Sequence, residues 1–133
     1  MKTVYTAFSK HNFFARNLIS AFTLSKGACP LNPFTNWGYF LDDMVERDLI
    51  KQANDHFVLL ADEIWVFGVI SNGVWHEMNL ARKNGKQVRY FSVGKKPSDI
   101  KEITAAELTF EQELIDELGE KRVKSILEEV ALG

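Results

Sequence analysis

Residues 66–91, "VFGVISNGVWHEMNLARKNGKQVRYF", decide the fold of this chain of 133 residues. They predict a buried strand, a glycine turn, a helix that ends at Asn84-Gly85, and a second strand. The helix carries a carboxylate, Glu77, where apolar residues are expected, because positions three and four residues apart share a helix face. Those neighbours are Gly73, Val74, Leu80 and Ala81. Glu77 is therefore predicted to point with the core-facing set.

Strands and helices alternate along the rest of the chain. Residues 2–8, "KTVYTAF", predict the first strand, and apolar residues at helical spacing predict a helix from Phe13 to about Leu24. A short second strand is expected in "ACPLNP", a long helix from about Leu41 to Leu60, and a central strand in "EIWVFGVI". A fourth strand in "QVRYFSV" and two short helices broken at Gly119 complete the pattern.

This alternation predicts an α/β fold of the flavodoxin-like or Rossmann-like type. We expect a three-layer sandwich with a parallel sheet of about four to five strands, right-handed crossovers and C-terminal helices. In the strand order 2-1-3-4, ligands bind beyond the carboxyl ends of the first and third strands. Residues 7–12 and 68–73 would meet there. The chain, 1–133, is expected to form a single domain.

Composition narrows the classes of partner. A formal net charge of −2 disfavours a role built on the phosphates of a nucleic-acid polymer. The single cysteine, Cys29, cannot form an internal disulfide, and its neighbours do not make a metal cluster. No apolar run approaches the roughly 20 residues of a membrane span. We expect a cytoplasmic protein with a small-molecule ligand, no metal and no membrane partner.

Ser71, Asn72 and Gly73 lie where the helix after the third strand is expected to begin. Unpaired backbone N–H groups and the positive end of the helix dipole would face the crevice there, which favours an anion. Gly73 would let a ligand approach the backbone, and the hydroxyl of Ser71 would add a hydrogen bond. The alternative is that Ser71 or Asn72 caps the helix and Gly73 is a turn glycine.

Glu77 is then a partly buried acid within reach of a ligand on this loop. A carboxylate in such a place can serve as a nucleophile or as a general base. The alternative is a structural acid paired with Arg82, Arg89 or a lysine, because acids are rarely buried without a partner.

The segment "SNGVWHEMNLA", residues 71–81, follows the pattern S-x-G-V-x-x-E-x-x-x-A. This pattern resembles the signature of the 2'-deoxynucleoside 5'-phosphate N-hydrolases, within the nucleoside 2-deoxyribosyltransferase superfamily. Three further segments resemble the family's first strand, an arginine–aspartate pair and the start of its third strand. They are "VYTAFS", "ERDLI" and "ADEIWVF". The resemblance covers roughly residues 3–91, in the right order.

The resemblance implies cleavage of an N-glycosidic bond in a nucleoside or nucleoside 5'-monophosphate, without a cofactor. Glu77 would attack C1' of the sugar as the base departs, and Tyr5 would hydrogen-bond this nucleophile. Water would resolve the glycosyl-enzyme ester in a hydrolase, which we favour, and an incoming base would resolve it in a transferase. The chemistry parallels that of retaining glycosidases, in which a carboxylate relieves an oxocarbenium-like transition state.

A second acid would help to protonate the leaving base. Asp48 matches the arginine–aspartate motif, but the stretch from Asp48 to Asp62 is about two helical turns longer than in the family. Asp55 keeps roughly the family's spacing and would share a helix face with Asp48. Either residue could instead be an exposed helix acid.

The resemblance also bears on the phosphate and on assembly. Ser71 stands where transferases acting on unphosphorylated nucleosides usually have an aspartate, and a hydroxyl does not repel a phosphate. A 5'-phosphorylated substrate is therefore expected, with Ser9 and Lys10 of "FSKHN" contacting the phosphate. The resemblance further implies a homodimer or a larger homo-oligomer.

Other features are assigned lesser roles. The histidines at positions 11, 56 and 76 lack metal spacing, and His76 is expected on the exposed side of its helix. Phe34, Trp37 and Tyr39 either stack on a base or close the core. The alternative to an enzyme is a non-catalytic nucleotide-binding or sensing module on the same fold.

Overall fold

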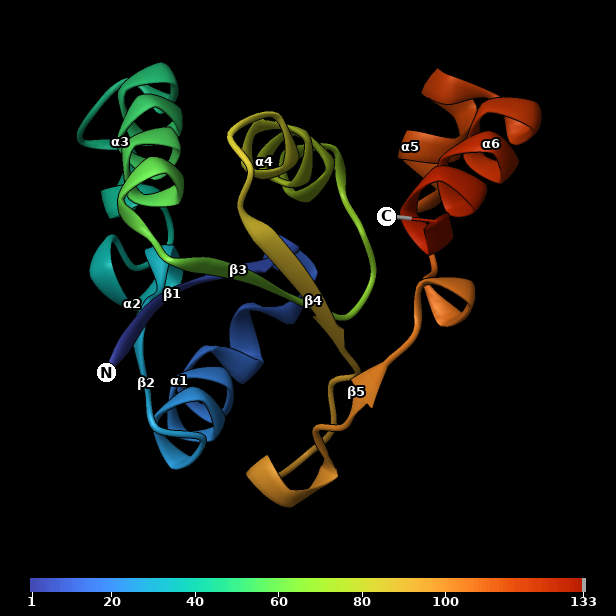
Figure 1. Cartoon of the computed structure of the whole chain (residues 1–133). Helices are drawn as coiled ribbons and strands as arrows, with labels where there is room; N and C mark the ends of the chain where they lie inside the picture. Colours follow the sequence, from blue (N-terminus) through green and yellow to red (C-terminus); the bar gives the residue numbers. More distant parts are fainter. Residues whose placement is uncertain (133) are drawn as a thin grey trace.

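The strands form one sheet in the computed structural model, which describes residues 1–132 (Figure 1). The order across the sheet is β2-β1-β3-β4-β5. The strands are β1 (Lys2–Phe8), β2 (Ala28–Leu31), β3 (Glu63–Phe67), β4 (Gln87–Phe91) and β5 (Glu102–Ile103). The first four strands are parallel, and β5 pairs antiparallel with β4. The predicted α/β fold with the order 2-1-3-4 is confirmed, and the number of strands lies within the predicted four to five. The antiparallel direction of the short edge strand β5 departs from the parallel sheet that was predicted.

Helices cover both faces of this sheet (Figure 1). α3 (Arg47–Leu60) and α4 (Asn72–Lys83) lie over one face, and α1 (Arg16–Ser25) lies over the other. The remaining helices are α2 (Pro33–Asn36), α5 (Gln112–Leu118) and α6 (Glu120–Leu132). Short 3₁₀ turns occupy Lys10–Ala15 (η1), Phe40–Asp43 (η2), Pro97–Asp99 (η3) and Ala105–Glu107 (η4).

The central strand β3 shows why this arrangement is stable. All five of its residues are buried, as expected for a parallel strand covered on both sides. Alternate side chains enter opposite cores. Ile64 and Val66 join the cluster beneath α3 and α4, whereas Trp65 and Phe67 join the cluster beneath α1.

The helix predicted from about Leu41 begins only at Arg47, so this prediction was wrong at its N-terminal end. The φ angles of the four residues Phe40–Asp43 lie between +52° and +61°, which makes a left-handed turn that no α-helix contains. Met44 is 77% exposed and Leu49 is 55% exposed, so neither contributes to a buried apolar face of the helix. Apolar spacing alone does not reveal where the backbone leaves the helical conformation.

The short helix α2 (Pro33–Asn36) was not predicted from the sequence. Asn32 caps this helix, because its side-chain oxygen accepts hydrogen bonds from the backbone N–H groups of Phe34 and Thr35. Pro33 occupies the first helical position, where the missing N–H costs nothing. Asn32 and Pro33, the last two residues of the predicted strand "ACPLNP", thus form the start of a helix.

The carboxyl end of β3 is shaped by Gly68. Its φ is +77°, and a Cβ there would lie 2.7 Å from the side-chain nitrogen of Asn12, so another residue would force a shift. Two residues later, Ile70 pairs with the C-terminal part of the chain. The N–H of Ile70 donates to the carbonyl of Thr109 (2.9 Å), and the N–H of Glu111 donates to the carbonyl of Ile70 (2.9 Å).

This pairing brings the C-terminal helices against the domain. Leu114 of α5 is buried in the same cluster as Val74 and Met78 of α4. The predicted break at Gly119 separates α5 from α6. Among residues 1–132, no helix combines the length and the apolar character that crossing a membrane requires.

Candidate functional site

A pocket of about 770 Å³ lies beyond the carboxyl ends of β1 and β3. Its walls come from α3, α4, the turn after β1 and the segment around residues 111–114. This is the position at which doubly wound sheets bind ligands. The structure brings together all eight residues predicted for the site, since each lines this pocket. They are Tyr5, Ser9, Asp48, Asp55, Ser71, Asn72, Gly73 and Glu77.

Glu77 and Tyr5 form the centre of this pocket. Tyr5 is only 1% exposed, and its hydroxyl donates a hydrogen bond to Oε2 of Glu77. Glu77 lies on the core side of α4, with Val74, Met78 and Ala81 buried around it, and it remains half-buried because the pocket opens onto it. Within residues 1–132, no lysine, arginine or histidine nitrogen approaches Glu77 closely enough for an ion pair.

Burial raises the pKa of Glu77 to about 8. The hydrogen bond from Tyr5 acts in the opposite direction, and the negative charge of Asp55 raises the pKa further. Burial and the adjacent Glu77 also raise the pKa of Tyr5 well above its ordinary value. Glu77 is therefore an acid poised to gain or lose a proton close to neutral pH, which is a property common among catalytic groups.

Asp55 lies close enough to Glu77 for its charge to act on the carboxyl group, whereas Asp48 lies nearer the N-terminus of α3. The charge of Asp55 contributes to the raised pKa of both Glu77 and Tyr5. Asp48 is exposed on the first turn of α3 and also lines the pocket, but it is not among the groups that shift the pKa of Glu77. Of the two acids left open by the sequence, Asp55 has the geometry to act with Glu77.

Asp55 is paired with His76, for which the sequence predicted only an exposed position. Nε2 of His76 lies 3.0 Å from Oδ1 and 3.2 Å from Oδ2 of Asp55, so the pair links α4 to α3. His76 is largely exposed, as expected from its position on the helix, but the exposed side here forms a wall of the pocket. The helical spacing shows which face a residue occupies and does not show that α3 packs beside that face.

The start of α4 fits both interpretations of the glycine loop. Ser71 is the N-cap, because its hydroxyl oxygen accepts a hydrogen bond from the N–H of Val74 (3.2 Å). A hydroxyl that accepts in this way can still donate its own hydrogen to a ligand. Asn72 and Gly73 are exposed at the pocket wall, and a Cβ on Gly73 would meet nothing closer than the Ser71 hydroxyl at 4.0 Å.

Ser9 has a partner that the sequence did not predict. Its hydroxyl donates to Oε1 of Glu111 (2.5 Å) and accepts from the backbone N–H of His11 (3.2 Å). Nε2 of His11 lies 3.8 Å from the same Glu111 oxygen. Glu111 was missed because it lies outside the stretch of sequence resemblance and enters the pocket only through the pairing of its backbone with Ile70.

The aromatic residues around the pocket mainly pack against one another. Trp37 stacks on Phe57 with ring centroids 5.7 Å apart and donates its indole N–H to Asn54 (3.0 Å). The ring of Phe13 contacts both Phe34 and Tyr39 edge to face. Phe34 and Trp37 also line the pocket, so the loop both closes the core and forms an apolar wall.

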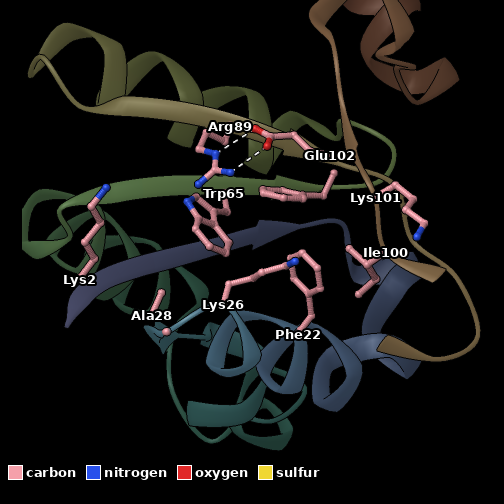
Figure 2. A pocket seen from close by; sticks show the side chains of 11 residues that line it. Lys2, Phe22, Lys26, Ala28, Trp65, Arg89, Ile100, Lys101 and Glu102 are labelled. Carbon is pink, nitrogen blue, oxygen red and sulfur yellow. Dashed lines mark hydrogen bonds and ion pairs between the residues drawn. The ribbon is translucent and has the colours of Figure 1, made fainter. Parts of the chain in front are cut away.

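A second pocket, of about 570 Å³, lies on the α1 side of the sheet (Figure 2). Its charged groups are matched with one another. Arg89 donates two hydrogen bonds to Glu102 (2.8 and 2.9 Å) and lies above the ring of Trp65. Glu63, which is 4% exposed, accepts hydrogen bonds from Lys2 and Trp65. Mutual pairing makes this network structural, and the pocket with Glu77 remains the candidate site.

The pKa of Glu63 supports this distinction. Burial pushes its pKa upward, but hydrogen bonds from Lys2 and Trp65 and the charges of Lys2 and Arg89 bring it below its ordinary value. Glu63 is therefore held in its ionised form, unlike Glu77. Among the described residues 1–132, no three histidine, cysteine or acidic side chains gather in a way that could hold a metal ion.

Comparisons with known proteins identify the domain and no activity. No curated protein matches the chain. A family model described as a domain of unknown function, DUF7768, matches residues 3–91, which is more than half of the chain. All eight predicted site residues fall inside this match, whereas Glu111 falls outside it. The chain therefore belongs to the DUF7768 family.

Proposed function

We propose that this protein cleaves the N-glycosidic bond of a nucleoside or nucleoside 5'-monophosphate, with Glu77 as the nucleophile. The observation that carries the proposal is the buried Glu77 carboxyl group at the pocket, held by the hydroxyl of Tyr5 and without a cationic partner among residues 1–132. The resemblance of residues 71–81 to the signature of the deoxynucleotide N-hydrolases supports the same chemistry.

The first step forms an ester on Glu77. One carboxylate oxygen bonds to C1' of the sugar, the bond from C1' to the base nitrogen breaks, and the bonding electrons leave with the base. Tyr5 fixes the carboxylate through its hydrogen bond. The pair formed by His76 and Asp55 is placed to deliver a proton to the departing base, which removes the developing negative charge.

The second step regenerates Glu77. Water attacks C1', the bond to the Glu77 oxygen breaks, and a proton passes from the water to a pocket base such as the pair formed by His76 and Asp55. Because the pocket opens to solvent, hydrolysis is the expected outcome, and an added free base that competed with water would instead give transfer.

The test is release of free base from a panel of nucleosides and nucleoside monophosphates, followed by chromatography. Glu77→Gln keeps the shape of the side chain but removes the nucleophile, so base release should fall by more than about a thousandfold. The matched control is Glu117→Gln, which changes an exposed residue of α5 and should retain wild-type activity. Base release that survives in Glu77→Gln would contradict the proposal.

A specific observation favours a second candidate function, a non-catalytic nucleotide-binding or sensing module. Because the pKa of Glu77 is about 8, most of its carboxyl groups carry a proton at neutral pH and are weak nucleophiles in the empty pocket. If a nucleotide raised the melting temperature while no base was released at any pH, the module would be the better description.

We also propose that the protein forms a homo-oligomer and is cytoplasmic, as expected from its sequence. Light scattering on the purified chain would give the mass in solution and test the first of them directly.

A further inference from the structure

Glu111 is fixed at the meeting point of the two elements that were expected to bind an anion. Its backbone N–H bonds to the carbonyl of Ile70, the residue directly before the N-cap of α4. Its side chain accepts a hydrogen bond from Ser9 in the turn after β1. A carboxylate of the protein is thus held beside both Ser9 and the start of α4.

The hydrogen bonds of Ser9 leave it no donor for a phosphate. A serine hydroxyl has one hydrogen, and Ser9 gives it to Oε1 of Glu111 at 2.5 Å. Its oxygen already accepts from the N–H of His11, and the residue is only 2% exposed. The hydroxyl therefore positions the Glu111 carboxylate and has no hydrogen to offer a ligand.

The negative charge of the pocket carboxylates also disfavours a bound phosphate. Glu111 and Glu113 lie at its C-terminal wall, and Asp48 and Asp55 line α3. Among the cations of the pocket wall, Arg47 is paired with Asp43 and lies above the ring of Phe40. Lys10 and Lys51 also line the pocket as exposed side chains, and His11 lies beside Glu111. A doubly charged phosphate next to Glu111 would be repelled, whereas a hydroxyl could donate to it.

We infer that Glu111 is a specificity-determining residue, which makes the pocket select an unphosphorylated nucleoside over the corresponding nucleotide. The Glu111 carboxylate accepts a hydrogen bond from a hydroxyl of the nucleoside's sugar. The inference rests on the proposed function and narrows its substrate class. It replaces the phosphorylated substrate expected from Ser71, because the Glu111 carboxylate lies against Ser9, where the phosphate was expected.

The test compares deoxynucleosides with their 5'-monophosphates as substrates of three proteins. These are the wild type, Glu111→Gln and the matched control Glu113→Gln, which removes a charge from the same wall without a contact to Ser9. The measured quantity is the ratio of kcat/KM for nucleoside over monophosphate. Because Gln can still accept the hydrogen bond from Ser9, Glu111→Gln should fold, and its melting temperature verifies this.

The wild type should favour the nucleoside by about tenfold or more, and Glu111→Gln should bring the ratio close to one by gaining activity on the monophosphate. Glu113→Gln removes a charge from the same wall but no contact to Ser9, so it should move the ratio much less than Glu111→Gln does. A wild-type preference for the monophosphate, or a ratio that does not move in Glu111→Gln, would overturn the inference. The first of these results would place the phosphate on Lys10, His11 or the start of α4 instead.

Failure of the proposed function gives a different pattern. If no protein releases base, calorimetric titration of the same nucleosides and monophosphates measures selection without turnover. Tighter binding of nucleosides by the wild type, reduced in Glu111→Gln, would support the role of Glu111 while the catalytic proposal fails. No binding of either ligand would overturn both.

Discussion

At the scale of single residues, the molecule contrasts two glutamates, the buried Glu63 and the half-buried Glu77. Glu63 is surrounded by donors and cations that keep it ionised, whereas Glu77 has one neutral donor, Tyr5, and a nearby negative charge on Asp55. The same side chain is thus placed in opposite protonation states by its surroundings. The surroundings of Glu63 suit a role in stability, and those of Glu77 suit the catalytic role proposed for it.

The pKa of Glu77 predicts the pH dependence of catalysis. If the ionised form attacks C1', kcat/KM should rise with pH and level off above about 8, the pKa of this group in the free enzyme. Tyr5→Phe removes a hydrogen bond that lowers the pKa, so the rise should move to higher pH. Asp55→Asn removes a charge that raises the pKa, so the rise should move to lower pH. A rate that falls through pH 8 would show that protonated Glu77 is the active form.

The same group predicts an unusual pH dependence of stability. The pKa of Glu77 is about 8 in the folded protein and close to 4.5 in the unfolded chain. Between these values the folded state holds the proton more tightly, so this contribution to stability is full below pH 4.5 and is lost as the pH rises to 8. Each unit of difference corresponds to about 1.4 kcal/mol. Urea unfolding from pH 5 to 8 should show the loss in the wild type and not in Glu77→Gln.

At the scale of elements, the network around Glu63 ties four strands together. Lys2 of β1, Glu63 of β3, Arg89 of β4 and Glu102 of β5 are joined by hydrogen bonds and ion pairs. Because the pKa of Glu63 is lowered, its contribution to stability is present above the unfolded value of about 4.5 and is lost as the pH falls below it. Glu63→Gln should therefore weaken the fold at pH 7 and flatten its acid unfolding curve, as circular dichroism would measure. A variant as stable as the wild type at pH 7 would contradict this account.

The N-terminus of α4 allows stability and binding to be separated. Gly73 lies in the first turn with open space where a Cβ would lie, so Gly73→Ala should raise the free energy of unfolding by about 0.5–1 kcal/mol. If a ligand approaches this backbone closely, the added methyl group should at the same time weaken substrate binding. Thermal unfolding and substrate titration on one preparation would measure both effects. Unchanged affinity would leave Gly73 with a structural role only.

At the scale of the whole molecule, the domain depends on its C-terminal segment. Leu114 is buried in the cluster beneath α4 and lies three residues after Glu111. Leu114→Ala should lower the free energy of unfolding by about 2–5 kcal/mol and loosen the wall that holds Glu111. Leu49→Ala removes an equal volume from an exposed site on α3 and should change stability by less than about 0.5 kcal/mol. Denaturant unfolding of the two variants makes the comparison, and equal losses would show that the segment is not part of the core.

The sequence predicted the fold through local patterns, and the exceptions have physical causes. The continuous apolar run predicts β3, and the glycine turn after it predicts the start of α4. Both signals are local and need no knowledge of distant residues. The late start of α3 follows from the left-handed turn at Phe40–Asp43, which apolar spacing does not encode. The positions of Glu77 and Tyr5 in the site could be predicted because α4 and β1, which carry them, were predicted. His76 and Glu111 required knowledge of which segments pack side by side.

The pairing of Ile70 with Thr109 and Glu111 divides the site between two parts of the chain. The part that defines the family, residues 3–91, holds the reactive carboxyl group, its tyrosine and the acid on α3, while the residue proposed to choose the substrate arrives from beyond it. If both proposals hold, a relative with a different later segment would admit a different ligand and keep the same proposed nucleophile. Substrate choice in this family would then evolve as an independent module, and grafting residues 92–132 between members would transfer it.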